Sequence, residues 1–206
     1  MVITISSQFG AGEIVLGKAI ASKLGYTFAD REIIQRIAKE ANVSTHWVES
    51  FEQEAGSKVS RMISHMVSQT KVDQVLKDEH GYLDEQIYLD YLVLIVSQAA
   101  DEGNVVIMGR GSQYILKGHP ETRHILLIND FENRVKFTMT DQNVSEKQAV
   151  RIVTHEDRRR AALYSRLGKK DYENPSLFHL VLNMADINPA TAVTIVAALI
   201  EGTARK

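Results

Sequence analysis

Strand-like apolar runs alternate with helical segments along this chain, and this alternation constrains the fold more than any other feature of the sequence. The runs cover residues 2–5, 26–30, 104–111, 123–130 and 178–184. They are almost uniformly apolar, which is typical of strands that are buried on both faces of a parallel sheet. Because helices cover both faces of such a sheet, we predict an α/β fold with a three-layer parallel sheet.

The segments between these runs have helical periodicity. The helix after the first strand carries apolar residues at Leu16, Ile20 and Leu24, and Gly25 is predicted to end it. Residues 31–96 are mostly helical in pattern and are predicted to form a lobe over one end of the sheet, and later helices are expected at 131–142, 145–168 and 188–202. Because no Gly/Ser-rich linker occurs, we predict a single domain over 1–206, with its core at about 1–30 and 97–206.

Charge, cysteine content and hydropathy exclude several functional classes. A formal net charge of -2 gives no electrostatic reason to expect a nucleic acid or membrane partner. The chain has no Cys, which excludes disulfides and thiolate metal sites, and its seven His lack the spacing of a metal site. The chain has no leader-like basic start and no apolar run near the roughly 20 residues of a membrane span. We therefore expect a cytoplasmic location.

A glycine-containing loop, SSQFGAGEIVLGK (6–18), follows the first strand and can be aligned with a phosphate-binding loop in two registers. In the first register, 12–19 match the Walker pattern G-x-x-x-x-G-K but fail at Ala19, where a hydroxyl is required. At about 100° per residue, Lys18 also points roughly 160° away from Leu16, which we expect to face the core. We therefore predict that Lys18 is a solvated helix lysine.

The second register begins at residue 7, directly after the strand. Its glycines allow close backbone approach, and the following helix contributes its N-terminal dipole. Glu13 occupies the lysine position, and Ile14 and Val15 occupy the hydroxyl positions. The predicted phosphate-binding residues are Ser7, Gly10, Ala11, Gly12, Glu13, Ile14 and Val15. The alternative is a tight strand-to-helix turn that requires small residues.

Several segments, in order, resemble the cytidylate kinase-like family, in the nucleoside monophosphate kinase group of P-loop proteins. They are ITISSQFGAG, LGYTFADREII, VVIMGRGSQYIL, ILLINDFENRV, HEDRRRAALYSRLGKKDYENP and LFHLVLNMADI, and they cover nearly the whole chain. The resemblance implies a P-loop type of sheet, an inserted helical acceptor lobe at about 31–96 and an arginine lid at about 151–172. It also implies that the protein transfers a phosphoryl group from ATP to a nucleoside monophosphate with Mg²⁺, which requires cations around the transferred group.

The resemblance assigns roles to individual residues. Arg110 matches the arginine that holds the acceptor phosphate, and Asp30 and Arg31 match the entrance of the acceptor site. Asp157 and Arg160 match an Asp-x-x-Arg pair in which the acid orients the base and the arginine contacts phosphate. The arginines predicted to act in catalysis are Arg158, Arg160 and Arg166, with Arg159 as a further lid residue and Arg134 at the start of the preceding helix.

Most of these residues have a structural alternative. Arg158, Arg159 and Arg160 fit a solvated helix surface with neighbouring acids, and Arg134 fits a surface position. Asp30 fits a cap for the helix that begins at Arg31. The position of Arg110, between two glycines after a strand, favours a functional role.

The chain also departs from the family at the loop. Cytidylate kinases proper carry Gly-Lys-Gly-Thr at 12–15, and the kinase-like relatives typically have an arginine there and another at the position of Ser7. Losing such a cation commonly costs a factor of about 10² or more in rate. Gly111 replaces an acid of the true cytidylate kinases, which leaves selectivity for cytosine or ribose open.

We therefore predict a nucleotide-binding protein that transfers a phosphoryl group to a nucleoside monophosphate or a similar small acceptor. The alternative is a catalytically impaired nucleotide sensor or interaction protein on the same fold, because Glu13 replaces the cation of the loop. The apolar stripe at 88–96 fits either a core segment or a contact between two copies of the chain. The expected partner is thus a small-molecule nucleotide, and a homodimer is left open.

Overall fold

A parallel sheet forms the centre of the protein. The computed structural model describes residues 1–30, 85–166 and 169–203. Within these residues, five strands pair in the order β2-β3-β1-β4-β5, and every pairing is parallel. The strands are β1 (Val2–Ser7), β2 (Thr27–Ala29), β3 (Val105–Met108), β4 (Thr122–Ile128) and β5 (Leu180–Asn183).

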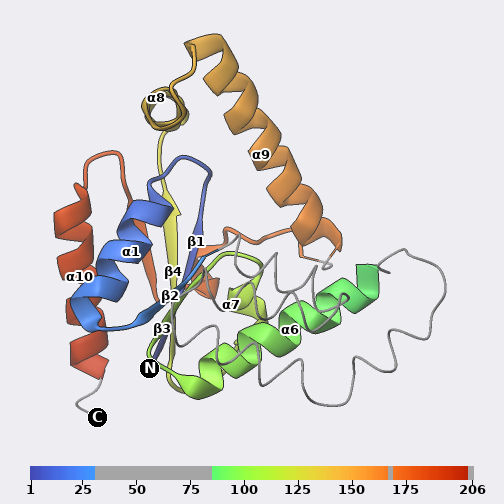
Figure 1. The fold of residues 1–206 in the computed structure, drawn as a ribbon, viewed down its shortest axis with the longest axis vertical. Helices are drawn as coiled ribbons and strands as arrows, with labels where there is room; N and C mark the ends of the chain where they lie inside the picture. The colour runs from blue at the N-terminus through green and yellow to red at the C-terminus, as the bar shows by residue number, and fades with distance from the viewer. Residues whose placement is uncertain (31–84, 167–168, 204–206) are drawn as a thin grey trace, which may run out of the picture.

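Helices cover both faces of this sheet, as predicted (Figure 1). On one face lie α1 (Glu13–Leu24) and α10 (Pro189–Thr203), which pack against each other. On the other face lie α6 (Glu85–Glu102) and α7 (Ser112–Ile115), in contact with β3 and β1 respectively. The expectation of a three-layer α/β fold is therefore confirmed.

Strand alternation sends the residues of β1 to two different environments. Ile3 and Ile5 join the main hydrophobic cluster with Leu16 and Ile20 of α1, so the predicted apolar stripe of this helix faces the sheet. Ser6 points to the other face, where its hydroxyl donates to Oε1 of Gln113 in α7. One face of β1 is thus apolar and the other carries polar contacts.

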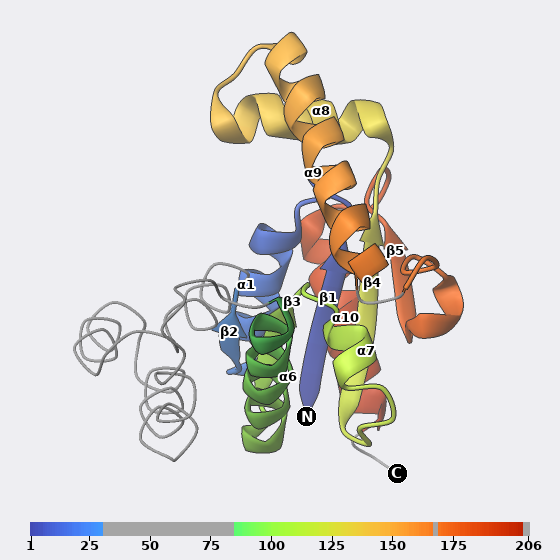
Figure 2. The ribbon, with the colours of Figure 1, turned by 90° about the vertical axis from the view of Figure 1, so that its right-hand side faces the viewer.

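Two further helices lie beyond the carboxyl ends of the strands. They are α8 (Phe131–Gln142) and α9 (Glu146–Arg166), and Figure 2 shows α9 running from the level of α8 back down toward α7. They share a small hydrophobic cluster of their own, made of Val135, Ala149 and Val153, against which Phe9 of the glycine loop packs. Because of this contact, the loop after β1 is part of the packing of α8 and α9.

The predicted element boundaries differ from the observed ones by a few residues. The helix predicted at 145–168 begins at Glu146, and Ser145 just before it donates its hydroxyl and its N–H to Oε1 of Gln148. The short helices α7 and η1 (Pro175–Leu177) were not predicted, because a single turn gives no periodic pattern.

The predicted acceptor lobe falls mostly outside the described residues. α6 runs without a break from Glu85 to Glu102, across the predicted lobe boundary at about 96, and Leu92, Ile95 and Val96 of its apolar stripe are buried. The division into lobe, core and lid stays a prediction. Among the described residues, no helix is both long enough and apolar enough to cross a membrane.

Candidate functional site

The glycine loop between β1 and α1 has a left-handed backbone at two positions. Gly10 has φ 80° and Gly12 has φ 84°, which L side chains rarely adopt. A Cβ at Gly10 would lie 2.9 Å from the carbonyl oxygen of Arg134, whereas a Cβ at Gly12 would meet nothing within 4 Å. Gly10 therefore lets the loop pack closely against α8, and Gly12 leaves space beside the start of α1.

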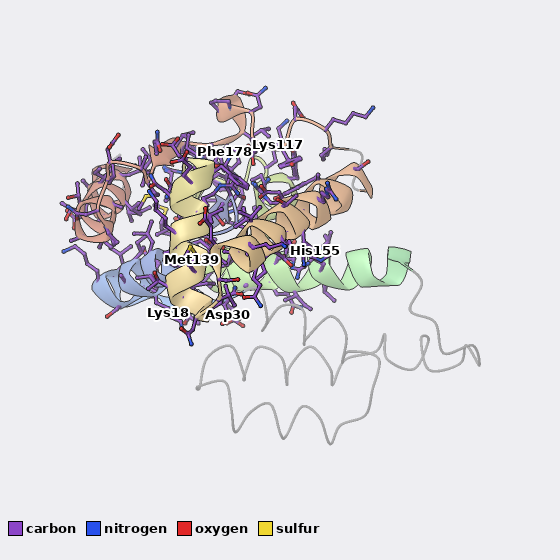
Figure 3. All side chains as sticks on the ribbon, turned by 90° about the horizontal axis from the view of Figure 1, so that it is seen from above. Lys18, Asp30, Lys117, Met139, His155 and Phe178 are labelled. Atoms are coloured by element: carbon purple, nitrogen blue, oxygen red, sulfur yellow. The ribbon has the colours of Figure 1, made fainter. Side chains whose placement is uncertain are left out.

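Backbone N–H groups at the start of α1 are the groups of this loop that could bind an anion. The first N–H groups of a helix have no carbonyl partner within the helix, and the dipole favours an anion there. The side chains add little to this: Ile14 is 39% exposed and Val15 is 52% exposed, at the predicted hydroxyl positions. Lys18 is exposed and projects outward from α1 (Figure 3), as predicted for a solvated helix lysine.

Arg134 of α8 connects the loop to α9. Its Nη1 donates to the carbonyl oxygen of Phe9 at 3.3 Å and to both carboxylate oxygens of Asp157 at 2.9 and 3.0 Å. Its guanidinium also lies 5.5 Å from the ring centroid of Phe131. Arg134 is only 7% exposed, so the alternative of a plain surface residue is wrong. Asp157 therefore orients a cation beside the loop, and that cation is Arg134.

Arg160 of α9 pairs with a carboxylate that lies beyond the helix. Its Nη1 donates to Oε1 of Glu173, and its guanidinium lies over the rings of Tyr172 and Tyr164, with centroid distances of 4.9 and 5.8 Å. The other carboxylate oxygen of Glu173 accepts from Nε2 of Gln8 at 3.1 Å. A hydrogen-bonded series therefore runs from the glycine loop to Arg160.

Aromatic side chains surround the C-terminal end of α9. Tyr164 stacks on Tyr172 with ring centroids 4.4 Å apart, and its hydroxyl accepts from Nε2 of Gln113 at 3.1 Å. Burial raises the pKa of Tyr114 to about 12, with Asp171 and Tyr164 adding to the shift. The Tyr114 phenol therefore stays protonated at neutral pH.

Arg110 lies at the same edge of the sheet, directly after β3. It has φ 56° and stands between two glycines that also have positive φ, so three consecutive residues are left-handed. The N–H of Gly109 donates to the carbonyl oxygen of Ile5, which fixes this turn beside β1. A non-glycine residue in this conformation costs about 1–2 kcal/mol. Such strain often accompanies a functional position.

The remaining predicted residues are distributed as follows. Asp30 directly follows β2 at the same edge, and Arg31 lies outside the described residues. Arg158 is exposed on α9, and the side chains of Arg159 and Arg166 are not among those described. Asp157 and Arg160, which match a family pair, bind Arg134 and Glu173 respectively.

Gln8 and Glu173 belong to the candidate site and were missed by sequence reasoning. Both lie inside segments that carried the resemblance, but neither matches a motif position. The available signal was their chemistry, namely an amide within the glycine loop and a carboxylate that follows an arginine-rich helix. No cluster of three or more potential metal ligands occurs among the described residues.

Comparison with known proteins identifies the family. A sequence model of the cytidylate kinase-like family matches residues 2–186. The chain belongs to the cytidylate kinase-like family. The predicted recognition is therefore confirmed over nearly the whole chain. No curated protein sequence matches this chain.

Solved structures with a similar fold add a second comparison. An uncharacterized protein from Eubacterium ventriosum ATCC 27560 has a TM-score of 0.68 and 16% identity, with 98% of each chain covered. Shikimate kinase from Bacteroides thetaiotaomicron has a TM-score of 0.51 and 15% identity, with 98% of each chain covered. TT1252 from Thermus thermophilus has a TM-score of 0.51 and 16% identity, covering 98% of this chain and 97% of that one. At these identities the likeness concerns the fold, and it confirms the predicted P-loop type for this member of the cytidylate kinase-like family.

Proposed function

We propose that this protein binds nucleotide phosphates at the loop 7–13 and transfers a phosphoryl group from ATP to a nucleoside monophosphate or a similar small acceptor. The observation that carries this proposal is the network that joins the loop to α8 and α9. Arg134 bonds to the loop carbonyl of Phe9, and Gln8 bonds to Glu173, which pairs with Arg160. Cations held beside a phosphate-binding loop are what phosphoryl transfer requires.

In this reaction, an oxygen of the acceptor phosphate forms a bond to the γ-phosphorus of ATP. The bond from that phosphorus to the β–γ bridging oxygen breaks, which gives ADP and a nucleoside diphosphate. No protein side chain forms a covalent bond, so the protein contributes positioning and charge stabilisation.

We assign the roles of the described residues by their positions beside the loop and the sheet edge, and those of Arg31 and Arg166 from the family resemblance alone. The backbone N–H groups of the loop and of the start of α1 hold the donor phosphates. Arg110 holds the acceptor phosphate, with Asp30 and Arg31 at the entrance of the acceptor site. Asp157 acts through Arg134, and the residues that close over the transferred group are Arg158, Arg160 and Arg166.

ATP and Mg²⁺ fit the loop to different degrees. The space beside Gly12 and the helix N-terminus suit a phosphate. For Mg²⁺, the positions that would supply a hydroxyl hold the partly exposed apolar side chains of Ile14 and Val15. Mg²⁺ is often bound mainly by substrate phosphates and water. We therefore assign no residue of this chain to it.

A coupled assay of ADP formation with CMP, dCMP, UMP and AMP tests this proposal. We expect turnover with at least one acceptor, and we expect Arg110→Ala to raise the KM for that acceptor at least tenfold, since it removes a charge-assisted phosphate contact. Folded protein that turns over none of these acceptors would contradict the proposed transfer to nucleoside monophosphates.

A second candidate function is a nucleotide sensor or interaction protein without catalysis. It is favoured by the carboxylate of Glu13 and by the apolar side chains of Ile14 and Val15 where the loop lacks a cation and a hydroxyl. Isothermal titration with ATP, ADP and CMP separates the two functions. Binding without ADP formation supports the sensor, and binding with ADP formation supports the kinase.

A further inference from the structure

Gln8 has both ends of its side-chain amide engaged. Its Oε1 accepts from the backbone N–H of Asn129 at 3.0 Å, just after β4, and its Nε2 donates to Oε2 of Glu173 at 3.1 Å. Its own N–H donates to the carbonyl oxygen of Leu127 at 3.0 Å. The side chain is thus fixed in one orientation, with its NH₂ group directed at the carboxylate.

Glu173 and two tyrosines hold Arg160 from different directions. The carboxylate binds Nη1, and the guanidinium lies over the stacked rings of Tyr172 and Tyr164. Tyr164 is itself only 2% exposed and is bonded to Gln113, so this platform is anchored in the core. Arg160 therefore has little freedom to choose another rotamer.

One donor atom of Arg160 has no acceptor within this arrangement. Its Nη2 is buried and has no hydrogen-bond partner in the described part of the chain. A buried donor without an acceptor is costly, and a negatively charged oxygen would satisfy it. Because the loop carries Glu13 in place of a lysine, a phosphate at the loop depends on cations from elsewhere.

We propose that Gln8 and Glu173 are positioning residues for phosphoryl transfer, which hold Arg160 so that Nη2 binds an oxygen of the transferred group. This inference rests on the proposed function. Catalytic donors are effective when their geometry is set before the reaction, and a small misplacement is costly. Gln8 sets this geometry from within the phosphate loop, and Glu173 transmits it to Arg160.

The test is a double-mutant cycle on the full-length protein, measured by steady-state ADP formation with the acceptor that the wild type uses. In Glu173→Gln, the new amide either places its NH₂ group against the NH₂ group of Gln8 or turns it toward Arg160 and loses that hydrogen bond. In Gln8→Glu, two carboxylates face each other. The double variant Gln8→Glu/Glu173→Gln exchanges the amide and the carboxylate, so that each of the three hydrogen bonds of this series can form again. The carboxylate now at position 8 can accept from the N–H of Asn129 and from the amide now at position 173, and the oxygen of that amide accepts from Arg160.

We expect each single variant to lower kcat about 10- to 100-fold. The KM for ATP should change by less than about threefold in Glu173→Gln, and it should rise in Gln8→Glu, which places a carboxylate in the loop. The double variant should recover kcat to within about tenfold of the wild type, although its KM for ATP rises because a carboxylate enters the loop. Gln8→Ala should lower kcat in the wild-type background but much less in an Arg160→Ala background. Gln142→Ala and Glu201→Gln, at exposed positions, are the matched controls and should retain wild-type kcat.

The outcomes separate this inference from the proposed function. A wild type without turnover overturns both. An active wild type whose folded single variants keep its kcat overturns this inference alone, as does a double variant no faster than the slower single variant. Urea unfolding of each variant establishes the folded fraction to which kcat refers.

Discussion

At the scale of single residues, Gly10 and Gly12 share a left-handed backbone but differ in their surroundings. A Cβ at Gly10 would collide with the backbone of Arg134 in α8, and a Cβ at Gly12 would enter open space. We expect Gly12→Ala to cost roughly 1 kcal/mol from backbone strain alone, and Gly10→Ala roughly 3 kcal/mol because α8 must also move. Urea unfolding of the two variants measures the difference. Equal losses would contradict the close packing of the loop on α8.

The charge of Glu13 is a second property at this scale. A carboxylate at the start of α1 opposes a phosphate, so Glu13→Gln should tighten ATP binding by about 1 kcal/mol, or about fivefold in Kd, at low salt. Isothermal titration measures this change. Glu201→Gln removes the same charge at an exposed position of α10 and serves as the control. Unchanged affinity for Glu13→Gln would show that ATP does not bind at this loop.

At the scale of elements, a hydrogen bond joins α9 to α7. The hydroxyl of Tyr164 accepts from Gln113, whose side chain is 2% exposed, whereas the buried hydroxyl of the neighbouring Tyr114 has no hydrogen-bond partner among the described residues. Tyr164→Phe leaves an unsatisfied donor and should lower the free energy of unfolding by about 1–2 kcal/mol, while Tyr114→Phe should change it by less than about 0.5 kcal/mol. Thermal unfolding of both variants checks this. A larger loss for Tyr114→Phe would contradict the assigned bonding.

The elements that the sequence predicts best are those whose pattern repeats. The strand β3 is uniformly apolar, and α1 shows a periodic stripe that ends at the left-handed Gly25, so both could be predicted. The helix α7 has only one turn, and its position depends on the glycine turn before it and on the contact of Gln113 with Ser6. Contacts of this kind join residues far apart in the chain and leave no local pattern.

The same limit applies to the candidate site. Spacing and resemblance pointed to Arg110, to the glycine loop and to the arginines of α9, because these occupy strand ends or repeat along one helix. The partners of these residues could not be predicted. Arg134 is bonded to Asp157, 23 positions away, and Gln8 is bonded to Glu173, 165 positions away. Such pairs form only when the helices fold back over the sheet edge.

At the scale of the whole molecule, polar contacts cross the middle of the sheet as well as its carboxyl edge. His124 of β4 is 5% exposed, and its Nδ1 lies 2.7 Å from the hydroxyl of Thr4. Its backbone N–H donates to Nδ1 of His179, just before β5, and the two rings are 5.3 Å apart. Burial above all, with further contributions from His179 and Arg123, lowers the pKa of His124 to about 4.

This lowered pKa predicts an acid-sensitive fold. Above pH 6.5 the imidazole is neutral in both states, so it gives no pH dependence there. As the pH falls from about 6.5 to about 4, His124 becomes protonated in the unfolded chain but stays neutral in the folded protein. The free energy of unfolding should therefore drop by roughly 3 kcal/mol over this range. His179, whose pKa is also lowered by burial and by Arg123, should add to this drop. Urea unfolding between pH 7 and pH 4 measures this drop. His124→Gln should flatten the profile, whereas His155→Gln, at an exposed position of α9, should leave it unchanged. A profile equally steep in His124→Gln and the wild type would assign the acid sensitivity to other groups.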